Sequence, residues 1–193
     1  MTVSARNASG HVGPKVGRVV VPRERIADRV AELGRQIAQD YRGREMTILA
    51  VMNGAAVFLA DLIRRLPLPM RLETTTARSY HGRSLTPGGL TVADLRSEAF
   101  AGRHVLVVDD ILDTGQTLRA LLDQLAGFAP ASTGVCVLLR KQRPALPRSA
   151  VDVRYVGFEI PDEFVVGYGL DYDDLYRNLP DVCLLHAEPE DQT

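Results

Sequence analysis

Apolar residues recur along the chain in two different patterns, and their alternation predicts strands joined by helices. Short continuous apolar runs indicate strands buried on both faces, whereas apolar positions three and four residues apart indicate helices with one buried face. The strands predicted in this way are residues 19–21, 47–52, 70–76, 105–108, 134–139 and 182–185. Three helices follow from apolar faces at Ile26, Val30, Leu33 and Ile37, at Phe58, Leu59, Leu62, Ile63 and Leu66, and at Leu118, Leu121, Leu122 and Leu125. This alternation predicts an α/β fold with a doubly wound, mainly parallel sheet.

The two ends of the chain depart from this pattern. Residues 1–17 are rich in glycine, serine and alanine without periodicity, so we expect a flexible N-terminal arm. The last third is punctuated by prolines, and residues 164–172 mix aromatic, glycine and acidic side chains. That stretch fits either a strand kinked by glycine or a flap whose ring stacks on a flat ligand. A length of 193 residues is typical of one domain, here residues 18–193.

The residues most suited to binding a ligand follow the central strand, residues 105–108. Two carboxylates, Asp109 and Asp110, come first, then Asp113, and then a small-residue loop, 114–117, that opens a predicted helix. Ligands of open parallel sheets bind just beyond the carboxyl ends of the strands. Carboxylates there suit hydroxyls and a metal ion, and backbone N–H groups at a helix start suit a phosphate. The pattern therefore predicts a sugar-phosphate site; the alternative is a strand and turn without a ligand.

Two families share parts of this segment. Residues 105–110 alone resemble the start of a response-regulator receiver domain, but such a domain would carry this strand at its own beginning and its phosphoacceptor on a later strand. Here the segment lies past the middle of the chain. Its continuation, residues 113–117, resembles the phosphoribosyl-diphosphate loop of type I phosphoribosyltransferases, which is a specific motif.

Composition narrows the function classes further. The net charge of −1 disfavours nucleic acid as the main partner, and no apolar stretch approaches the ~20 residues of a membrane span. Cys136 and Cys183 lie in apolar runs, which predicts small buried thiols rather than a disulfide. Reduced thiols and the lack of an apolar leader indicate a cytoplasmic protein.

Two later segments extend the resemblance. Residues 138–141 (Leu-Leu-Arg-Lys) and 156–172 are typical of the purine-salvage branch, so the chain resembles the hypoxanthine-guanine phosphoribosyltransferases from about residue 19 to 185. Weaker matches are residues 32–34, 58–62, 79–80 and 176–180. The resemblance implies the type I phosphoribosyltransferase fold, with a core at about 40–143 and a small hood built from about 18–38 and 144–187.

The same resemblance implies a reaction and its partners. Phosphoribosyl diphosphate would react with hypoxanthine or guanine to give IMP or GMP and pyrophosphate. Charge develops on the ribose as pyrophosphate leaves, in a state similar to that of glycosidases. Mg²⁺ is the expected cofactor, because it binds phosphate and carboxylate oxygens and neutralises the leaving group. The family also implies a homo-oligomer, either a dimer or a tetramer.

Roles on the phosphoribosyl side are implied residue by residue. Asp109 and Asp110 would hold the ribose hydroxyls, directly or through a metal-bound water, and Asp171 would bind a second Mg²⁺. The residues expected to cradle the 5′-phosphate are Thr114, Gly115, Gln116 and Thr117. The positions at which the family contacts pyrophosphate are Asn53, Gly54 and Arg177.

On the base side, Asp113 would be the general base at purine N7, and Lys141 would donate to the 6-oxo group. Phe164 would stack on the base, and the backbone of Val165 would bond its exocyclic edge. Ser79 and Tyr80 would belong to a mobile lid, although the local composition of residues 79–89 by itself favours a plain solvated hairpin.

Two departures from the family pattern stand out. Asp109 replaces the usual Glu and is one methylene shorter. Asn53 replaces a usual basic residue, in a turn that often carries a cis peptide bond, so pyrophosphate binding either weakens or depends on another arginine.

Three alternatives follow from these residues. A transferase that prefers xanthine would recognise the same 6-oxo group, so this alternative stays open. A transferase that uses pyrimidines is disfavoured by Lys141 and the long flap. A catalytically silent regulator that binds a nucleotide or RNA is disfavoured, because a pure binder needs no general base.

Overall fold

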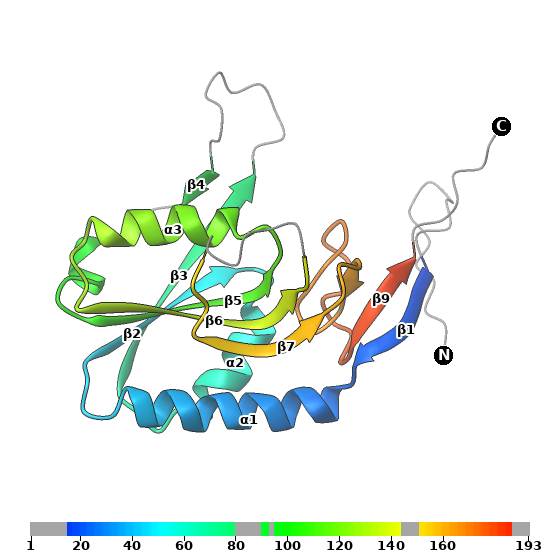
Figure 1. The fold of residues 1–193 in the computed structure, drawn as a ribbon, viewed down its shortest axis with the longest axis horizontal. Helices are drawn as coiled ribbons and strands as arrows, with labels where there is room; N and C mark the ends of the chain where they lie inside the picture. Colours follow the sequence, from blue (N-terminus) through cyan, green and yellow to red (C-terminus); the bar gives the residue numbers. More distant parts are fainter. Residues whose placement is uncertain (1–14, 80–89, 93–94, 144–150, 187–193) are drawn as a thin grey trace, which may run out of the picture.

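A six-stranded sheet is the centre of the computed structural model, which describes residues 15–79, 90–92, 95–143 and 151–186 (Figure 1). Its strand order is β4-β3-β2-β5-β6-β7. The strands are β2 (Met46–Met52), β3 (Met70–Ser79), β4 (Leu90–Val92), β5 (His104–Leu112), β6 (Ser132–Lys141) and β7 (Tyr155–Ile160). All neighbours from β3 to β7 pair in parallel, and β4 adds an antiparallel edge. The predicted mainly parallel sheet is confirmed.

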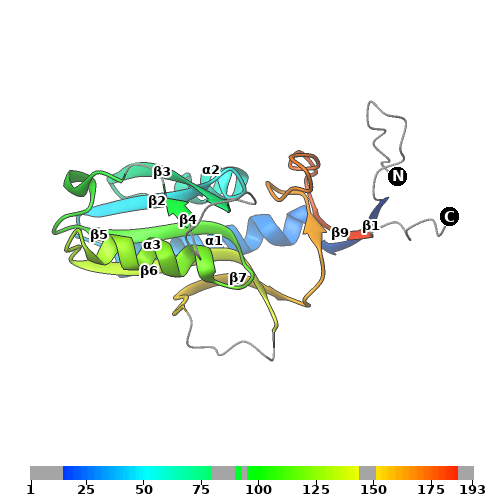
Figure 2. The ribbon, with the colours of Figure 1, turned by 90° about the horizontal axis from the view of Figure 1, so that it is seen from above.

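Helices cover both faces of this sheet, as predicted (Figures 1 and 2). The helices are α1 (Arg23–Asp40), α2 (Ala56–Ile63) and α3 (Gln116–Ala126), and a short 3₁₀ turn spans Ser97–Ala99. Successive residues of a strand point to opposite faces. Accordingly Ile48 and Leu106 pack with α1 and α2, whereas Leu49 and Val107 pack with α3. The strands read as continuous apolar runs because both of their faces are buried.

Helix α1 shows how the apolar spacing determines burial. Its four predicted core residues, Ile26, Val30, Leu33 and Ile37, are at most 1% exposed. Full burial of such a side chain contributes on the order of 1.5–3 kcal/mol. Because this stripe is continuous, the whole helix is held against the main sheet.

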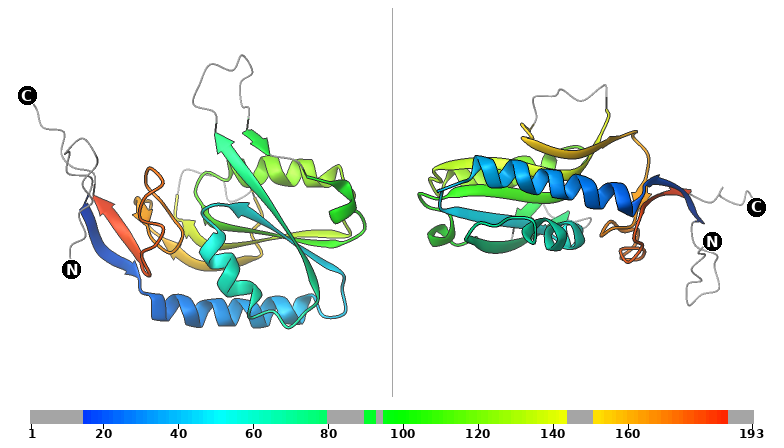
Figure 3. Two further views of the ribbon diagram at one scale, coloured as in Figure 1. Left: turned by 180° about the vertical axis from the view of Figure 1, so that it is seen from behind. Right: turned by 90° about the horizontal axis from the view of Figure 1, so that it is seen from below.

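A second, smaller sheet lies beyond the start of α1 (Figures 1 and 3). It consists of β1 (Lys15–Val21), β9 (Val182–His186) and β8 (Val165–Val166), in the order β1-β9-β8. Lys15 to Gly17, the end of the predicted N-terminal arm, belong to β1, in which Lys15 and Val16 pair with β9, and the rest of the arm lies outside the described residues. The division into core and hood stays a prediction; α1 and β7 lie with the main sheet, and β1, β8 and β9 form the small one.

Strand β5 is longer than the sequence predicted. The prediction ended this strand at Val108, which is wrong, because pairing with β6 continues to Leu112 opposite Arg140. Asp109 and Asp110 therefore lie within the strand. The sequence also missed β7, whose six residues contain a glycine and a glutamate and show little apolar pattern.

Among the described residues, no helix combines the length and the apolar character that crossing a membrane would require.

Candidate active site

Most of the predicted site residues gather at the carboxyl ends of β2, β5 and β6, and the others lie at the end of β3, at β8 and in the loop after β8, or outside the described residues. Strands β2 and β5 are neighbours, but the chain continues from β2 to β3 on one side and enters β5 on the other. Such a reversal of strand order opens a crevice in which ligands of α/β proteins bind. The turn after β2 and the loop after β5 border this point, and β6 delivers Lys141 beside them.

The loop after β5 leads directly into α3. Gly115, the N-cap residue, precedes the helix with φ +77°, a left-handed conformation that favours glycine, and it has no side chain with which to cap the first turn. The first N–H groups of a helix lack intrahelical partners and attract anions. Thr114 and Gln116 are exposed, and the Gln116 N–H donates a long hydrogen bond of 3.5 Å to Thr114 Oγ1. The loop therefore offers an accessible anion site.

The predicted general base, Asp113, lies in a cluster with three other charged side chains, Lys141, Arg143 and Asp162. Lys141 Nζ donates to Asp113 Oδ2 at 3.2 Å and lies 3.5 Å from Asp162 Oδ1. Arg143 Nη2 lies 2.7 Å from Asp113 Oδ1 and 2.9 Å from Asp162 Oδ1. The cluster is electrically balanced. The Lys141 side chain is only 10% exposed, so packing fixes its stem while the ammonium reaches the site.

The two acidic residues of β5 point to opposite faces of the sheet. Asp109 is 6% exposed, and burial, reinforced by the charge of Asp110, raises its pKa well above the ordinary range. Its Oδ1 accepts the Asp110 N–H at 3.0 Å. Burial also raises the pKa of Asp110, although its hydrogen bonds and the charge of Arg177 oppose this shift. Asp110 is the more open of the two carboxylates.

The turn after β2 is packed between two other segments. The Met52–Asn53 peptide bond is cis, and Gly54 follows it. On one side Asp110 lies against Gly54; on the other, a Cβ at position 169 would lie 2.3 Å from the Gly54 carbonyl oxygen. Gly169 also has a φ of +101°. Glycine at both positions therefore lets the loop after β8 close against the end of β2.

Arg177 holds this second loop together. Its Nη1 donates to the Gly169 carbonyl and lies 2.9 Å from Asp171 Oδ1, and its Nη2 donates to Asp174. Asp171 Oδ2 accepts the Asp174 N–H at 3.0 Å. Arg177 thus lies near enough to Asp110 for its charge to favour the ionised carboxylate.

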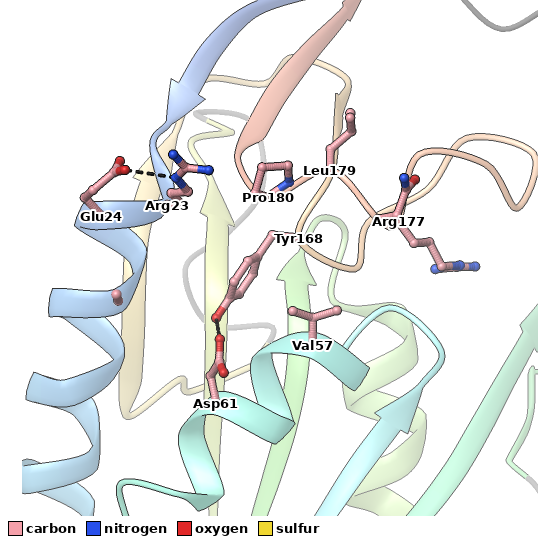
Figure 4. Close-up of a pocket in the computed structure, with 10 residues that line it drawn as sticks. Arg23, Glu24, Val57, Asp61, Tyr168, Arg177, Leu179 and Pro180 are labelled. Carbon is pink, nitrogen blue, oxygen red and sulfur yellow. Dashed lines mark hydrogen bonds and ion pairs between the residues drawn. The ribbon is translucent and has the colours of Figure 1, made fainter. Parts of the chain in front are cut away.

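Figure 4 shows how the same loop is attached to α2. The Tyr168 hydroxyl donates to Asp61 Oδ2 at 2.6 Å, across a cavity of about 520 Å³. The cavity is lined by α1, α2 and residues 177–180, and it contains none of the acidic residues of β5. Apart from Arg177, which lines the cavity, the predicted site residues therefore lie outside it.

The two residues predicted to contact the base, Phe164 by stacking and Val165 through its backbone, differ in exposure. Phe164 is 50% exposed and meets Tyr172 edge to face, with ring centroids 5.7 Å apart. Val165 is buried in β8, where it pairs with Leu184. An exposed ring on a rigid strand end is suited to stacking on a flat ligand. Ser79 ends β3, whereas Tyr80 lies outside the described residues.

Two members of the charged cluster were missed by the sequence reasoning. Arg143 and Asp162 carry no motif of their own. One signal was available for Arg143: it lies two residues after Lys141 at a strand end, where alternate side chains share a face. Nothing in the spacing shows that Asp162, nineteen residues beyond Arg143, returns to the same place.

Comparison with known proteins agrees with this geometry. The family of phosphoribosyl transferase domains matches residues 20–173. The hypoxanthine-guanine phosphoribosyltransferase of Mycobacterium avium is 42% identical over 167 residues, which cover 83% of this chain and 81% of the relative. The hypoxanthine phosphoribosyltransferase of Salmonella typhimurium is 43% identical over 165 residues, which cover 84% and 91%. A crystal structure of a hypoxanthine-guanine phosphoribosyltransferase from Bacillus anthracis has a TM-score of 0.80 at 36% identity, covering 89% of this chain and 99% of that one.

The fold and the family match together define a phosphoribosyltransferase. The chain belongs to this family and, within it, to the hypoxanthine-guanine phosphoribosyltransferases. The resemblance seen in the sequence is confirmed, while the roles of individual residues stay predictions.

Proposed function

We propose that this chain salvages purines by transferring the phosphoribosyl group of phosphoribosyl diphosphate to hypoxanthine or guanine, releasing pyrophosphate and forming IMP or GMP. The observation that carries the proposal is the pairing of Asp113 Oδ2 with Lys141 Nζ at 3.2 Å, directly before the open start of α3. A carboxylate beside an ammonium suits the N7 and 6-oxo edge of an oxopurine. The helix start suits the 5′-phosphate of the second substrate.

Each side of the site would contribute a distinct step. The first turn of α3 binds the 5′-phosphate, and Asp110 orients the ribose hydroxyls. Arg177 and the Asn53-Gly54 turn hold the pyrophosphate as it leaves. Asp113 takes or holds the N7 proton while N9 attacks the ribose, and Lys141 stabilises the charge that develops on the 6-oxo group. Phe164 stacks on the base, the backbone of Val165 bonds its exocyclic edge, and Ser79 and Tyr80 belong to a mobile lid.

The carboxylates fit a magnesium ion that arrives with the substrate. Among the described residues, no group of three His, Cys, Asp or Glu side chains is placed to hold a metal alone. Mg²⁺ commonly binds one or two carboxylates together with substrate phosphates. Asp110 and Asp171 would serve as those ligands. Asp109 was also predicted at the metal site, but its carboxylate is buried and points to the opposite face of the sheet from Asp110. The bound ion would neutralise the charge of the leaving pyrophosphate.

Assembly and location extend the proposal. We expect a homo-oligomer, a dimer or a tetramer, in the cytoplasm. Sedimentation of the purified protein tests the first expectation, and a monomer at all concentrations would contradict it.

Steady-state kinetics test the proposed function directly. Purified protein is assayed with hypoxanthine, guanine, xanthine, adenine and uracil at fixed phosphoribosyl diphosphate, with Mg²⁺ and after its removal by a chelator. We expect Mg²⁺-dependent formation of IMP and GMP. Nucleotide binding without turnover of any oxopurine would favour a silent regulator, and faster turnover of xanthine would assign the alternative base.

A further inference from the structure

Arg143 joins the two carboxylates that flank Lys141. Its Nη2 donates a hydrogen bond of 2.9 Å to Asp162 Oδ1 and lies 2.7 Å from Asp113 Oδ1 in an ion pair. The Arg143 side chain is 28% exposed, and its Nε is buried without a hydrogen-bond partner among the described residues. Arg143 is thus held inside the cluster and not extended into solvent.

The contacts distinguish the two oxygens of Asp113. Oδ1 is fully buried and has no hydrogen-bond partner among the described residues, so that Arg143 holds it by an ion pair alone; the side chain as a whole is 42% exposed. Oδ2 contacts Lys141 Nζ. Because Oδ1 is enclosed, Oδ2 is the oxygen left for a ligand. Oδ2 and Lys141 Nζ then present an acceptor and a donor side by side, which matches a protonated N7 next to a 6-oxo group.

Asp162 adds a connection to the other side of the base site. It lies two residues before Phe164, the exposed ring that is expected to stack on the base. Arg143 therefore bridges the loop that carries the general base and the segment that carries the stacking ring. The bridge fixes both relative to the end of β6.

We propose that Arg143 is a positioning residue for phosphoribosyl transfer. It holds Asp113 through Oδ1, so that Oδ2 faces purine N7, and through Asp162 it ties this orientation to the segment with Phe164. Arg143 does not itself touch the substrate. The inference rests on the proposed function, since it concerns the carboxylate that handles the N7 proton.

A neighbouring ion pair offers a matched control. Arg140 and Glu159 pair across β6 and β7 near the same strand end, and among the described residues the Arg140 guanidinium pairs with Glu159 and not with Asp113. Exposed ion pairs contribute little to stability and have no reason to affect turnover. Arg140→Met therefore removes a comparable positive charge and should leave the orientation of Asp113 unchanged.

The test compares Arg143→Met, Arg143→Ala and Arg140→Met with the unmodified protein. A small displacement of a catalytic group can lower turnover by about 10²-fold, so we expect Arg143→Met to reduce kcat with hypoxanthine at least about tenfold. KM for phosphoribosyl diphosphate should change less than about threefold, because that side of the site is intact. Added guanidinium ion, below concentrations that unfold the protein, should restore part of the kcat of Arg143→Ala. Arg140→Met should stay within about twofold of the unmodified protein.

A double-mutant cycle tests the link to Asp162. If Arg143 and Asp162 act as one unit, Arg143→Met combined with Asp162→Asn should lower kcat no further than Arg143→Met alone. If the losses of kcat in the two single variants add up in the double variant, the proposed link between Arg143 and Asp162 is overturned.

An active unmodified protein whose folded Arg143→Met variant keeps kcat within about twofold would overturn the inference while leaving the proposed function intact. If Arg143→Met does not fold, Arg143→Ala without guanidinium rescue overturns it. An unmodified protein that turns over no oxopurine would overturn the proposed function itself, and the inference with it.

Discussion

Asp110 approaches Gly54 so closely that a Cβ at position 54 would lie 1.9 Å from Asp110 Oδ2. Real Cβ atoms do not make such a contact, so any side chain at this position must displace the carboxylate. The contact joins the end of β2 to the end of β5, the two strands between which the order of the sheet reverses. The position of Asp110, the carboxylate proposed to orient the ribose, therefore depends on the absence of a methyl group at position 54, after the neighbouring strand.

Gly54→Ala should therefore damage the phosphoribosyl side of the site. Moving Asp110 should raise KM for phosphoribosyl diphosphate about tenfold or more. Overpacking should also lower the free energy of unfolding by about 1–3 kcal/mol. Gly127→Ala is a suitable control, because its φ is −66° and the nearest atom to its Cβ would lie at 3.3 Å. An unchanged KM in Gly54→Ala would contradict the role given to Asp110.

Asp113→Asn should lower kcat far more than it weakens binding of phosphoribosyl diphosphate. A positioned general base contributes ~10²–10⁴-fold, and the amide keeps the shape of the side chain while losing its proton affinity. Single-turnover measurements are needed, because product release often limits enzymes that close a lid. A loss below about threefold on every base, with chemistry confirmed as rate-limiting, would remove Asp113 from this role.

Local patterns predicted the frame of this fold and the place of its site. The stripe on α1 and the apolar run that ends at Asp109 are properties of neighbouring residues, so periodicity alone reveals them. The burial of Asp109 was not predictable in that way, since it depends on how far β6 accompanies β5. The contact of Gly54 with Gly169, and that of Arg143 with Asp162, join segments far apart in sequence. Such contacts form only when the chain folds, so the spacing of residues in the sequence does not predict them.

Tyr168→Phe should weaken the attachment of the loop after β8. Losing the hydrogen bond to Asp61 should lower the free energy of unfolding by about 0.5–1.5 kcal/mol at neutral pH. Burial raises the pKa of the Tyr168 hydroxyl, and the hydrogen bond to Asp61 and its charge raise it further. The folded protein thus holds this proton more tightly than the unfolded chain, whose tyrosines ionise near about pH 10.

The sign of the pH dependence follows from that difference. The contribution of Tyr168 is fully present below about pH 10 and is lost as the pH rises further, because only the unfolded chain gains from ionisation. The stability gap between the unmodified protein and Tyr168→Phe should therefore shrink above about pH 10. Urea unfolding of both proteins from about pH 8 to 11 measures the gap. The pKa of Tyr155 is also raised, but Tyr155 is present in both proteins, so its contribution to the pH dependence cancels in the difference. A gap that stays constant would contradict this assignment.

Lys141 should determine which bases the protein accepts. Its ammonium offers three donors and no acceptor, so a 6-oxo group accepts from it, whereas the 6-amino group of adenine leaves the charge without a partner. Sites built to bond one group can reject an analogue that lacks it by ~10⁴-fold, since a desolvated polar group is left unpaired. We therefore expect hypoxanthine or guanine to exceed adenine by at least about a thousandfold in kcat/KM. Lys141→Met should narrow this ratio mainly by slowing the oxopurine reaction, whereas Arg140→Met, one residue earlier, should leave it unchanged. Comparable turnover of adenine by the unmodified protein would show that Lys141 does not read the base.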